Sequence, residues 1–328
     1  MHAWLCETLE GVDKLRWAEL ATPEPQPGEV RIAIKAASLN FPDLLTVKGQ
    51  YQVKPPLPFV PGSEFAGHVE AVGEGVTHLK AGQPVACVGA SGGFATHACV
   101  KAASVMPLPS GFDVVDGACF ALTYGTSHHA LLDRAQLKAG ETVLVLGAAG
   151  GVGTAAIQIA RAAGAHVVAA VSSAAKAEFC RRLGADETIE YGDGDTTKLR
   201  EAIKAATAGK GPDLVYDPVG GALAEPVFRS IAWRGRYVVI GFTLGAIPAL
   251  PLNLPLLKGA SIVGVFWGEF MRREPKAGAA GLAHLAQWYR EGKIKPAIDC
   301  RLPMRDVRAA YARMGTRQVQ GKVVLVND

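Results

Sequence analysis

The chain lacks the marks of several protein classes. Its six cysteines show no CxxC spacing, so neither a disulfide framework nor a cysteine-built zinc site is expected. There is no block of like charge, and the net charge of +4 is too small and too evenly spread to favour nucleic-acid binding. Residues 1–7 contain no apolar segment of the signal-peptide kind. We therefore expect a cytoplasmic protein with reduced thiols.

Long uninterrupted apolar runs are also missing. The stretch 142–160 is apolar, but it contains four glycines and lies between strand and helix signals, which favours a buried core over a membrane span. The 49% hydrophobic and 20% charged residues are typical of a globular protein, and 328 residues suffice for two domains.

Two patterns of secondary structure follow one another. Before about Asp116, short strands at 29–35, 64–72 and 83–88 are separated by proline and glycine clusters, which indicates a β-rich, barrel-like domain. After it, strands and helices alternate, which predicts a parallel, doubly wound sheet. The strands expected there are 142–146, 166–171, 214–216, 236–240 and 261–265, and the helices include 174–183 and 196–206. Helices near 279–290 and 304–314 precede a strand at 322–326 that can return to the first domain.

The turn from Ala148 to Gly153 is the most informative motif. It follows the strand 142–146 directly and precedes a helix. A strand, a glycine-rich turn and a helix N-terminus together bind a pyrophosphate, because the backbone approaches closely and the helix dipole favours negative charge. Ala148, Gly150 and Gly153 occupy the three fingerprint positions. The motif predicts a bound dinucleotide, the alternative being a glycine-rich loop without a cofactor.

The residues after the second strand of this domain favour NADPH. An acidic residue at this point normally binds the ribose hydroxyls of NAD. Here Val171 is followed by Ser172, Ser173 and, slightly later, Lys176, which suit a 2′-phosphate instead. In the alternative interpretation the serines cap the next helix and Lys176 is solvated.

The segments 37–43, 61–64 and 217–221, with the glycine-rich turn, carry a family resemblance. The chain resembles the zinc-free quinone oxidoreductase branch, which includes zeta-crystallin-like proteins, of the medium-chain dehydrogenase/reductase superfamily. The resemblance implies an α/β fold with a GroES-like β-rich catalytic domain (1–122 and 269–328) and an inserted Rossmann domain with a doubly wound parallel sheet (123–268). It also implies a homodimer and NADPH-dependent reduction of a small quinone or enone.

A catalytic zinc is not expected. Zinc-dependent relatives carry a cysteine near position 40 and a Gly-His-Glu motif at 62–64, whereas this chain has Asn40 and Ser63. A catalytic zinc site needs three protein ligands, and His68, His78 and His97 do not restore that pattern.

The resemblance also implies a set of cofactor contacts. Tyr191, Phe242, Phe266 and Arg317 have alternatives as packing or surface residues. The full set is Phe41, Asp43, His128, Gly150, Gly151, Val152, Ser172, Ser173, Lys176, Tyr191, Gly241, Phe242, Thr243, Val265, Phe266, Trp267 and Arg317.

The candidate catalytic residues are Asn40, Tyr51 and Thr123. No Ser-His-Asp arrangement and no paired-carboxylate motif is evident. Asn40 is expected to hydrogen-bond the acceptor carbonyl or the nicotinamide, and Tyr51 to orient the substrate or donate a proton. Thr123 and His128 are expected to face the nicotinamide half of the cofactor. The structural alternatives are a turn residue for Asn40, a helix N-terminal charge for Asp43, a surface aromatic for Tyr51 and a helix surface for His128.

Three functions remain open from the sequence. The first is an NADPH-dependent quinone oxidoreductase, the second an enoyl reductase for acyl-CoA or small enones, and the third an NADPH-binding structural or RNA-binding protein. The run 261–266 is expected at a sheet edge, where it can pair across a two-fold axis.

Overall fold

The computed structural model describes residues 1–89, 91–192 and 195–328, and the chain divides into two compact units. The first unit comprises Met1–Leu122 and Pro296–Asp328, and the second Thr123–Lys295. Each unit is described by itself below.

The second boundary differs from the one expected at residue 268/269. Residues 269–295 lie in the second unit because helix α10 (Pro275–Arg290) contacts helix α3 (Ala121–His128). The rings of His128 and His284 are in edge-to-face contact, with their centroids 5.3 Å apart, and a methyl group on Gly281 would approach His128 Nδ1 to 3.2 Å.

The first unit is built on a largely antiparallel sheet. Its strands run in the order β14-β15-β3-β4-β5-β7, β6 pairs with β3, and β1 and β2 form a separate pair. In β3 buried and less buried residues alternate, as expected for a strand with one face on the core. The elements are β1 (His2–Leu5), β2 (Arg16–Glu19), β3 (Glu29–Ser38), α1 (Phe41–Val47), β4 (Glu64–Val72), β5 (Pro84–Val88), β6 (His97–Lys101), β7 (Val105–Pro107), α2 (Val114–Gly117), β14 (Ile298–Pro303), α11 (Val307–Gly315) and β15 (Lys322–Val326).

The end of the chain returns to this sheet, as the sequence predicts. Strand β15 pairs antiparallel with β3 and parallel with β14. It brings Lys322 next to the end of β3, where Leu39 N donates to Val323 O at 3.0 Å.

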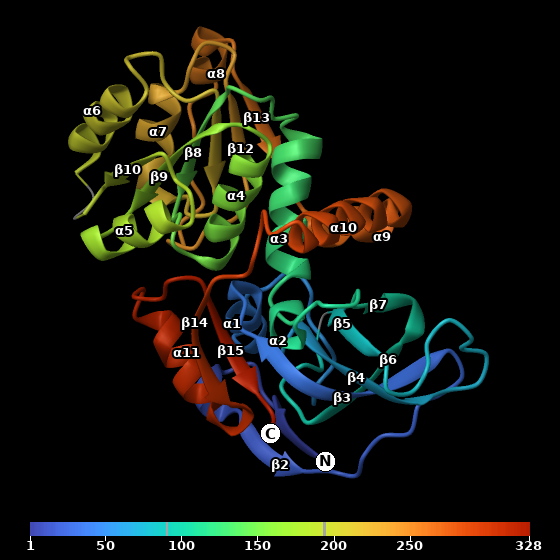
Figure 1. Ribbon diagram of the computed structural model, residues 1–328. Coiled ribbons are helices and arrows are strands. Elements are labelled where there is room, and N and C mark those ends of the chain that lie inside the picture. Colours follow the sequence, from blue (N-terminus) through green and yellow to red (C-terminus); the bar gives the residue numbers. More distant parts are fainter. Residues whose placement is uncertain (90, 193–194) are drawn as a thin grey trace. The chain divides into compact units, whose positions relative to one another are not determined.

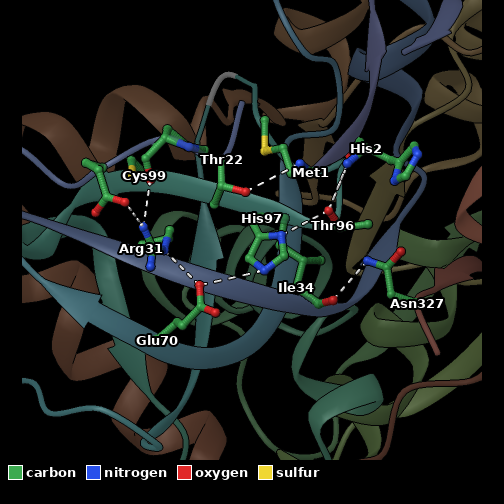
Figure 2. A network of polar contacts seen from close by, with 12 residues as sticks. Met1, His2, Thr22, Arg31, Ile34, Glu70, Thr96, His97, Cys99 and Asn327 are labelled. Carbon is green, nitrogen blue, oxygen red and sulfur yellow. Dashed lines mark hydrogen bonds and ion pairs between the residues drawn. The ribbon is translucent and has the colours of Figure 1, made fainter. Parts of the chain in front are cut away.

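Polar side chains tie the strands of this sheet together on one side (Figure 2). Arg31 Nε on β3 donates to Glu70 Oε2 on β4 at 2.7 Å, and the same carboxylate lies 3.6 Å from His97 Nε2 on β6. His97 Nδ1 lies 2.9 Å from Thr96 Oγ1, which accepts the backbone N–H of His2. These contacts hold β3, which ends at Ser38, two residues before Asn40, and Asn40 directly precedes helix α1.

The second unit is a doubly wound parallel sheet with helices packed around it (Figure 1). Its strand order is β10-β9-β8-β11-β12-β13, and every pairing in it is parallel. The inner strand β8 is buried on both faces, which explains its continuous apolar sequence. Its elements are α3, β8 (Thr142–Leu146), α4 (Gly151–Ala162), β9 (His166–Val171), α5 (Ala174–Arg182), β10 (Glu187–Glu190), α6 (Thr196–Ala206), β11 (Leu214–Asp217), α7 (Ala224–Ser230), β12 (Arg236–Val239), α8 (Asn253–Lys258), β13 (Ser261–Gly264), α9 (Trp267–Arg273) and α10.

The expected α/β fold, with a β-rich domain and an inserted parallel-sheet domain, is confirmed. Within the described part of the chain, no helix is both long enough and apolar enough to cross a membrane.

Candidate functional site

The glycine-rich turn in the second unit joins β8 to α4. Gly150 is the residue before the helix, and its N–H donates to Gly147 O at 3.0 Å. A methyl group on Gly153 would approach Gly147 O and the backbone of Ala148 to 2.6–2.7 Å, so only glycine fits there. A methyl group on Gly150 would meet only Gly147 O, at 3.4 Å. No side chain caps this helix, so its first N–H groups can bind an anion, as a pyrophosphate site requires.

The structure adds Gly147 to this motif. Its φ of +55° lies in the left-handed region, which glycine tolerates best. A side chain there would also strike Val219, since a Cβ would lie 2.8 Å from its Cγ2. The sequence analysis assigned Ala148 to the first fingerprint position, yet a glycine directly after a predicted strand was a usable signal for Gly147.

Helix α3 is linked to the start of α4 through Ser127. Its hydroxyl lies 2.9 Å from Thr123 O, 3.1 Å from Val152 O and 2.8 Å from the hydroxyl of Tyr216 on β11. Thr123 is itself buried. Ser127 and Tyr216 thus position two predicted site residues, Thr123 and Val152, and the sequence analysis missed both.

The end of β9 carries the residues predicted to select the cofactor. Lys176 Nζ donates to Ser172 Oγ at 3.1 Å, so a cation and a hydroxyl lie together there. Ser173 is the residue before α5, yet its side chain makes no capping hydrogen bond. Tyr191 lies at the same end of the sheet, because its N–H donates to Val171 O at 3.0 Å.

The segments after β12 and β13 carry further predicted contacts of this unit. Thr243 N donates to Pro218 O at 3.1 Å, and the ring of Phe242 packs against Gly220. Gly241 lies in the same loop. Val265 is held by a bond from its N–H to Val239 O, and Phe266 is 54% exposed. Trp267 differs, because its ring is buried against Gly125.

His128 is paired within the second unit. Its Nε2 lies 3.1 Å from His284 Nδ1, and the ring of His284 packs against Trp288. Burial, followed by the charge of His284, lowers the pKa of His128 to about 4. His128 is therefore neutral at pH 7, and His284 is a neighbour that the sequence analysis did not identify.

In the first unit, Asp43 and Asn40 organise the start of α1. Asp43 accepts hydrogen bonds from Asn40 N at 2.8 Å and from Ser63 N at 2.9 Å. The Asp43 side chain is fully buried, and burial raises its pKa to about 6. The alternative interpretation of Asp43 as a helix N-terminal acid therefore describes one of its roles.

The Asn40 carboxamide has partners at both of its polar atoms. Its Nδ2 donates to Glu64 Oε2 at 3.1 Å, and its Oδ1 accepts from Lys322 Nζ. Lys322 Nζ lies 3.4 Å from Glu64 Oε2, and both side chains are almost completely buried. Glu64 Oε1 also accepts the N–H of Leu122 at 2.8 Å, in the first turn of α3. The sequence analysis missed Glu64 and Lys322, although a charged residue at the start of an apolar strand was visible in both cases.

Comparison with known proteins shows the family. The family model described as a zinc-binding dehydrogenase matches residues 151–283, and that of the alcohol dehydrogenase GroES-like domain matches 26–110. Quinone oxidoreductase-like protein 2 of Bos taurus is 34% identical, over 99% of this chain and 96% of the bovine protein. The chain belongs to the quinone oxidoreductase branch of the medium-chain dehydrogenase/reductase superfamily.

Solved structures of other medium-chain oxidoreductases agree in fold. A mycobacterial protein in complex with NADPH is 30% identical, with a TM-score of 0.92 over 100% of both chains. The quinone oxidoreductase of Thermus thermophilus, described alone and in its complex with NADPH, is 32% identical, with a TM-score of 0.86 over 100% of both chains. Our chain is therefore an oxidoreductase of this superfamily.

The remaining predicted residues of this oxidoreductase lie in the first unit. Phe41 begins α1 and is half-buried, as is Tyr51. Burial, followed by the charge of Asp43, raises the pKa of the Tyr51 phenol. Arg317 is exposed just after α11, with a φ of +57°.

At positions 40 and 63, where zinc-dependent relatives carry a cysteine and a histidine, this chain has a carboxamide and a hydroxyl group. Asn40 contacts the Lys322 ammonium group, and Ser63 Oγ is buried without a hydrogen-bond partner among the described residues. Over residues 1–89, 91–192 and 195–328, no three histidine, cysteine or acidic side chains are grouped to hold a metal.

Proposed function

We propose that this oxidoreductase uses NADPH to reduce a quinone or a similarly activated carbonyl compound without a metal ion. The observation that carries the proposal is the end of β9. There Lys176 and Ser172 are in contact, and no acidic side chain stands at positions 172–176 to favour NAD. The NADPH complexes of two relatives support the same cofactor.

NADPH supplies a hydride when it is bound. The first turn of α4 binds its pyrophosphate, and Lys176 and Ser172 bind the 2′-phosphate. The proposed contacts in the second unit further include His128, Gly150, Gly151, Val152, Ser173, Tyr191, Gly241, Phe242, Thr243, Val265, Phe266 and Trp267. Those in the first unit are Phe41, Asp43 and Arg317.

The acceptor is oriented by the side chains of Asn40, Tyr51 and Thr123. The contacts with Lys322 and Glu64 hold the Asn40 carboxamide in one orientation. The Tyr51 phenol stays protonated at neutral pH, because its pKa is raised, and so it can donate a proton. A quinone is a good electron acceptor, so positioning accounts for much of the rate.

The test is a panel of acceptors with both nicotinamide cofactors. We expect 1,4-benzoquinone to be reduced with NADPH in preference to NADH. Lys176→Ala should lower the preference for NADPH about ten- to hundredfold, since a hydrogen bond to a charged group contributes about 1.5–3 kcal/mol. Lys198→Ala is the matched control, because Lys198 is an exposed helical lysine paired with Asp195 on α6. An unchanged cofactor ratio in Lys176→Ala would contradict the assignment.

The second candidate is an enoyl reductase for acyl-CoA or small enones. The half-buried Tyr51 phenol favours it, because reduction of an enone needs a proton more than reduction of a quinone does. Crotonyl-CoA and simple enones in the same panel distinguish the two. Tyr51→Phe should slow enone reduction more than quinone reduction, and equal effects would remove the proton-donor role. Tight NADPH binding with no turnover of any acceptor would instead favour a structural or RNA-binding protein.

A second copy of the chain is the proposed partner of β13. This strand is at the sheet edge and largely exposed, with Ile262 44% exposed. Large apolar side chains near it and α8 are also exposed, and such a surface is typical of an interface. They are Trp233, Ile247, Leu252, Leu256, Leu257 and Phe266. Light scattering should show a dimer that Ile262→Lys weakens, and a wild-type monomer would overturn the proposal.

A further inference from the structure

The carboxamide of Gln158, on α4, binds the chain close to both places where it passes between the two units. Its Oε1 accepts the N–H of Lys295 at 2.6 Å, and its Nε2 donates to Lys295 O at 2.9 Å. The same Oε1 accepts the hydroxyl of Tyr124 at 3.2 Å. Lys295 is the last residue of the second unit, and Tyr124 is the second residue in it. One side chain thus ties the two ends of this unit's sequence to α4.

The carboxamide of Gln158 is held in one orientation. Since the N–H of Lys295 can only donate and its carbonyl oxygen can only accept, the two ends of the amide cannot be exchanged. Gln158 is 7% exposed, and burial of a carboxamide is costly unless its polar atoms are hydrogen-bonded, as both are here. An apolar side chain would be buried at lower cost but could not bind the backbone of Lys295. This points to a role in positioning rather than in burial.

The contact with Tyr124 is the second one that joins α3 to α4. The first is Ser127 Oγ, which donates to Val152 O at 3.1 Å. The order is reversed between the helices, since the earlier residue of α3 meets the later residue of α4. An α-helix rises 1.5 Å per residue, so Val152 and Gln158 lie about 9 Å apart along the axis of α4. Two contacts at this separation stop α3 from pivoting on α4, which a single contact would allow.

The register of α3 on α4 sets the position of Thr123 within the second unit. Thr123 directly precedes Tyr124, and its carbonyl oxygen accepts the Ser127 hydroxyl at 2.9 Å. The first turn of α4 is the proposed pyrophosphate site, and Thr123 is a proposed acceptor residue. The distance between the two therefore depends on how α3 is held against α4.

We propose that Gln158 is a positioning residue for hydride transfer, which holds Thr123 and the returning chain at Lys295 in fixed positions against α4. This inference rests on the proposed NADPH-dependent reduction. Gln158 acts through the protein groups that it binds, and adds no chemical step. Its effect is on rate, because hydride transfer needs the acceptor and the nicotinamide at a closely defined distance and angle.

The first test follows hydrogen exchange in the full chain without cofactor. With ¹⁵N-labelled lysine, Lys295→Arg identifies the backbone resonance of Lys295. In Gln158→Met, whose side chain has similar length but no amide, the Lys295 N–H should exchange about tenfold faster than in wild type. The N–H of Lys293, which donates to Trp288 O at 2.9 Å, is the internal reference and should not change. A Lys295 N–H that is unprotected in wild type, or equally protected in both proteins, would overturn the inference whatever the activity.

The second test separates positioning from cofactor affinity. Gln158→Met should lower kcat for quinone reduction with NADPH about ten- to hundredfold, because misplaced reacting groups react slowly. The Kd of NADPH in a fluorescence titration should stay within about twofold of wild type, since the backbone N–H groups at the start of α4 are unchanged. A glutamine with a merely structural role would lower the amount of folded protein and leave the kcat of the folded molecules unchanged.

Two further variants complete this test. Tyr124→Phe keeps both hydrogen bonds between Gln158 and Lys295, so it should lower kcat by less, and it takes the place of Gln158→Met if that variant fails to fold. Gln287→Met is the matched control and should keep the wild-type kcat, because Gln287 is an exposed glutamine on α10 that donates to Glu291 Oε1.

The outcomes separate this inference from the proposed function. Wild-type kcat in both Gln158→Met and Tyr124→Phe overturns the positioning role alone. A Kd of NADPH that rises as much as kcat falls also overturns it, because the effect is then on cofactor binding. The absence of NADPH oxidation by the wild type with every acceptor overturns the proposed function, and the positioning role with it.

Discussion

Replacing Lys322 by methionine tests how the buried polar cluster of the first unit is held together. The ammonium group of Lys322 donates to Leu39 O at 3.0 Å and to Asn40 Oδ1, and it lies 3.4 Å from Glu64 Oε2. Methionine retains the apolar stem and removes the charge. Glu64, which is 0% exposed, then has a buried charge without its cation.

The expected loss in the free energy of unfolding depends on the hydrogen bonds that Glu64 keeps in Lys322→Met. Removing one partner of a buried ion pair typically costs about 3–5 kcal/mol, because the other charge stays buried. Glu64 keeps hydrogen bonds from Ser38 Oγ, Asn40 Nδ2 and Leu122 N, which still stabilise its carboxylate. We therefore expect the lower end, about 3 kcal/mol. For a domain of this size, that loss lowers Tm by about 6–12 °C.

The assay is urea unfolding followed by circular dichroism, with Lys35→Met as the matched control. Lys35 also lies in the sheet of the first unit, but its side chain is exposed and donates to Asp328 O. The control should stay within about 0.5 kcal/mol of wild type. Glu64→Gln combined with Lys322→Met should recover part of the loss, because the uncompensated charge is gone.

Two results would refute the reasoning. One is a Lys322→Met variant whose free energy of unfolding lies within about 1 kcal/mol of the wild-type value, because leaving a buried carboxylate without its cation should cost more than that. The other is additivity of the two substitutions, because groups that interact directly should show a coupling free energy.

Three further predictions follow from single contacts. Gly153→Ala should destabilise the second unit by about 1–3 kcal/mol, because the new methyl group would lie 2.6 Å from Gly147 O. The same variant should bind NADPH more weakly in a fluorescence titration. Gly315→Ala is the control, since a methyl group there meets open space. Ser127→Ala should cost about 1–3 kcal/mol in urea unfolding by leaving the buried Tyr216 hydroxyl unpaired, and adding Tyr216→Phe should recover part of it. The pKa of Asp43 is raised from 3.8 to about 6 on folding, so its contribution to stability is present below about pH 4 and lost as pH rises through 6. The free energy of unfolding of wild type relative to Asp43→Asn should therefore fall by about 2 kcal/mol between pH 4 and pH 7, and a flat difference would contradict the shift.

The fold was largely predictable from local pattern. Strands β8, β9 and β15 occupy the residue ranges expected from the sequence, because buried parallel strands and a returning core strand are continuous apolar runs. The boundary after the second unit was not predictable in this way. It depends on contacts between α10 and α3, such as that of His128 with His284, 156 residues apart in the chain.

In the candidate site, too, contacts between residues close in the sequence were predictable, and contacts between distant segments were not. Ser172 lies just before α5 and Lys176 lies in its first turn, so their contact joins residues only four apart in the sequence. Asn40, Glu64 and Lys322 come from three distant segments, and only the pairing of β15 with β3 brings them together. The sequence predicted Asn40 as a site residue, but its partners depend on sheet register.

One feature of the sequence could have predicted the ion pair of Glu64 and Lys322, namely the charge of these two strand residues. Glu64 begins β4 and is followed by the apolar residues 65–67, and Lys322 begins β15, whose other residues are all apolar. A charged residue is rarely buried unless it is paired, so two such residues of opposite sign in one predicted sheet indicate a buried ion pair. That reasoning would have predicted the ion pair of Glu64 and Lys322 from the sequence alone.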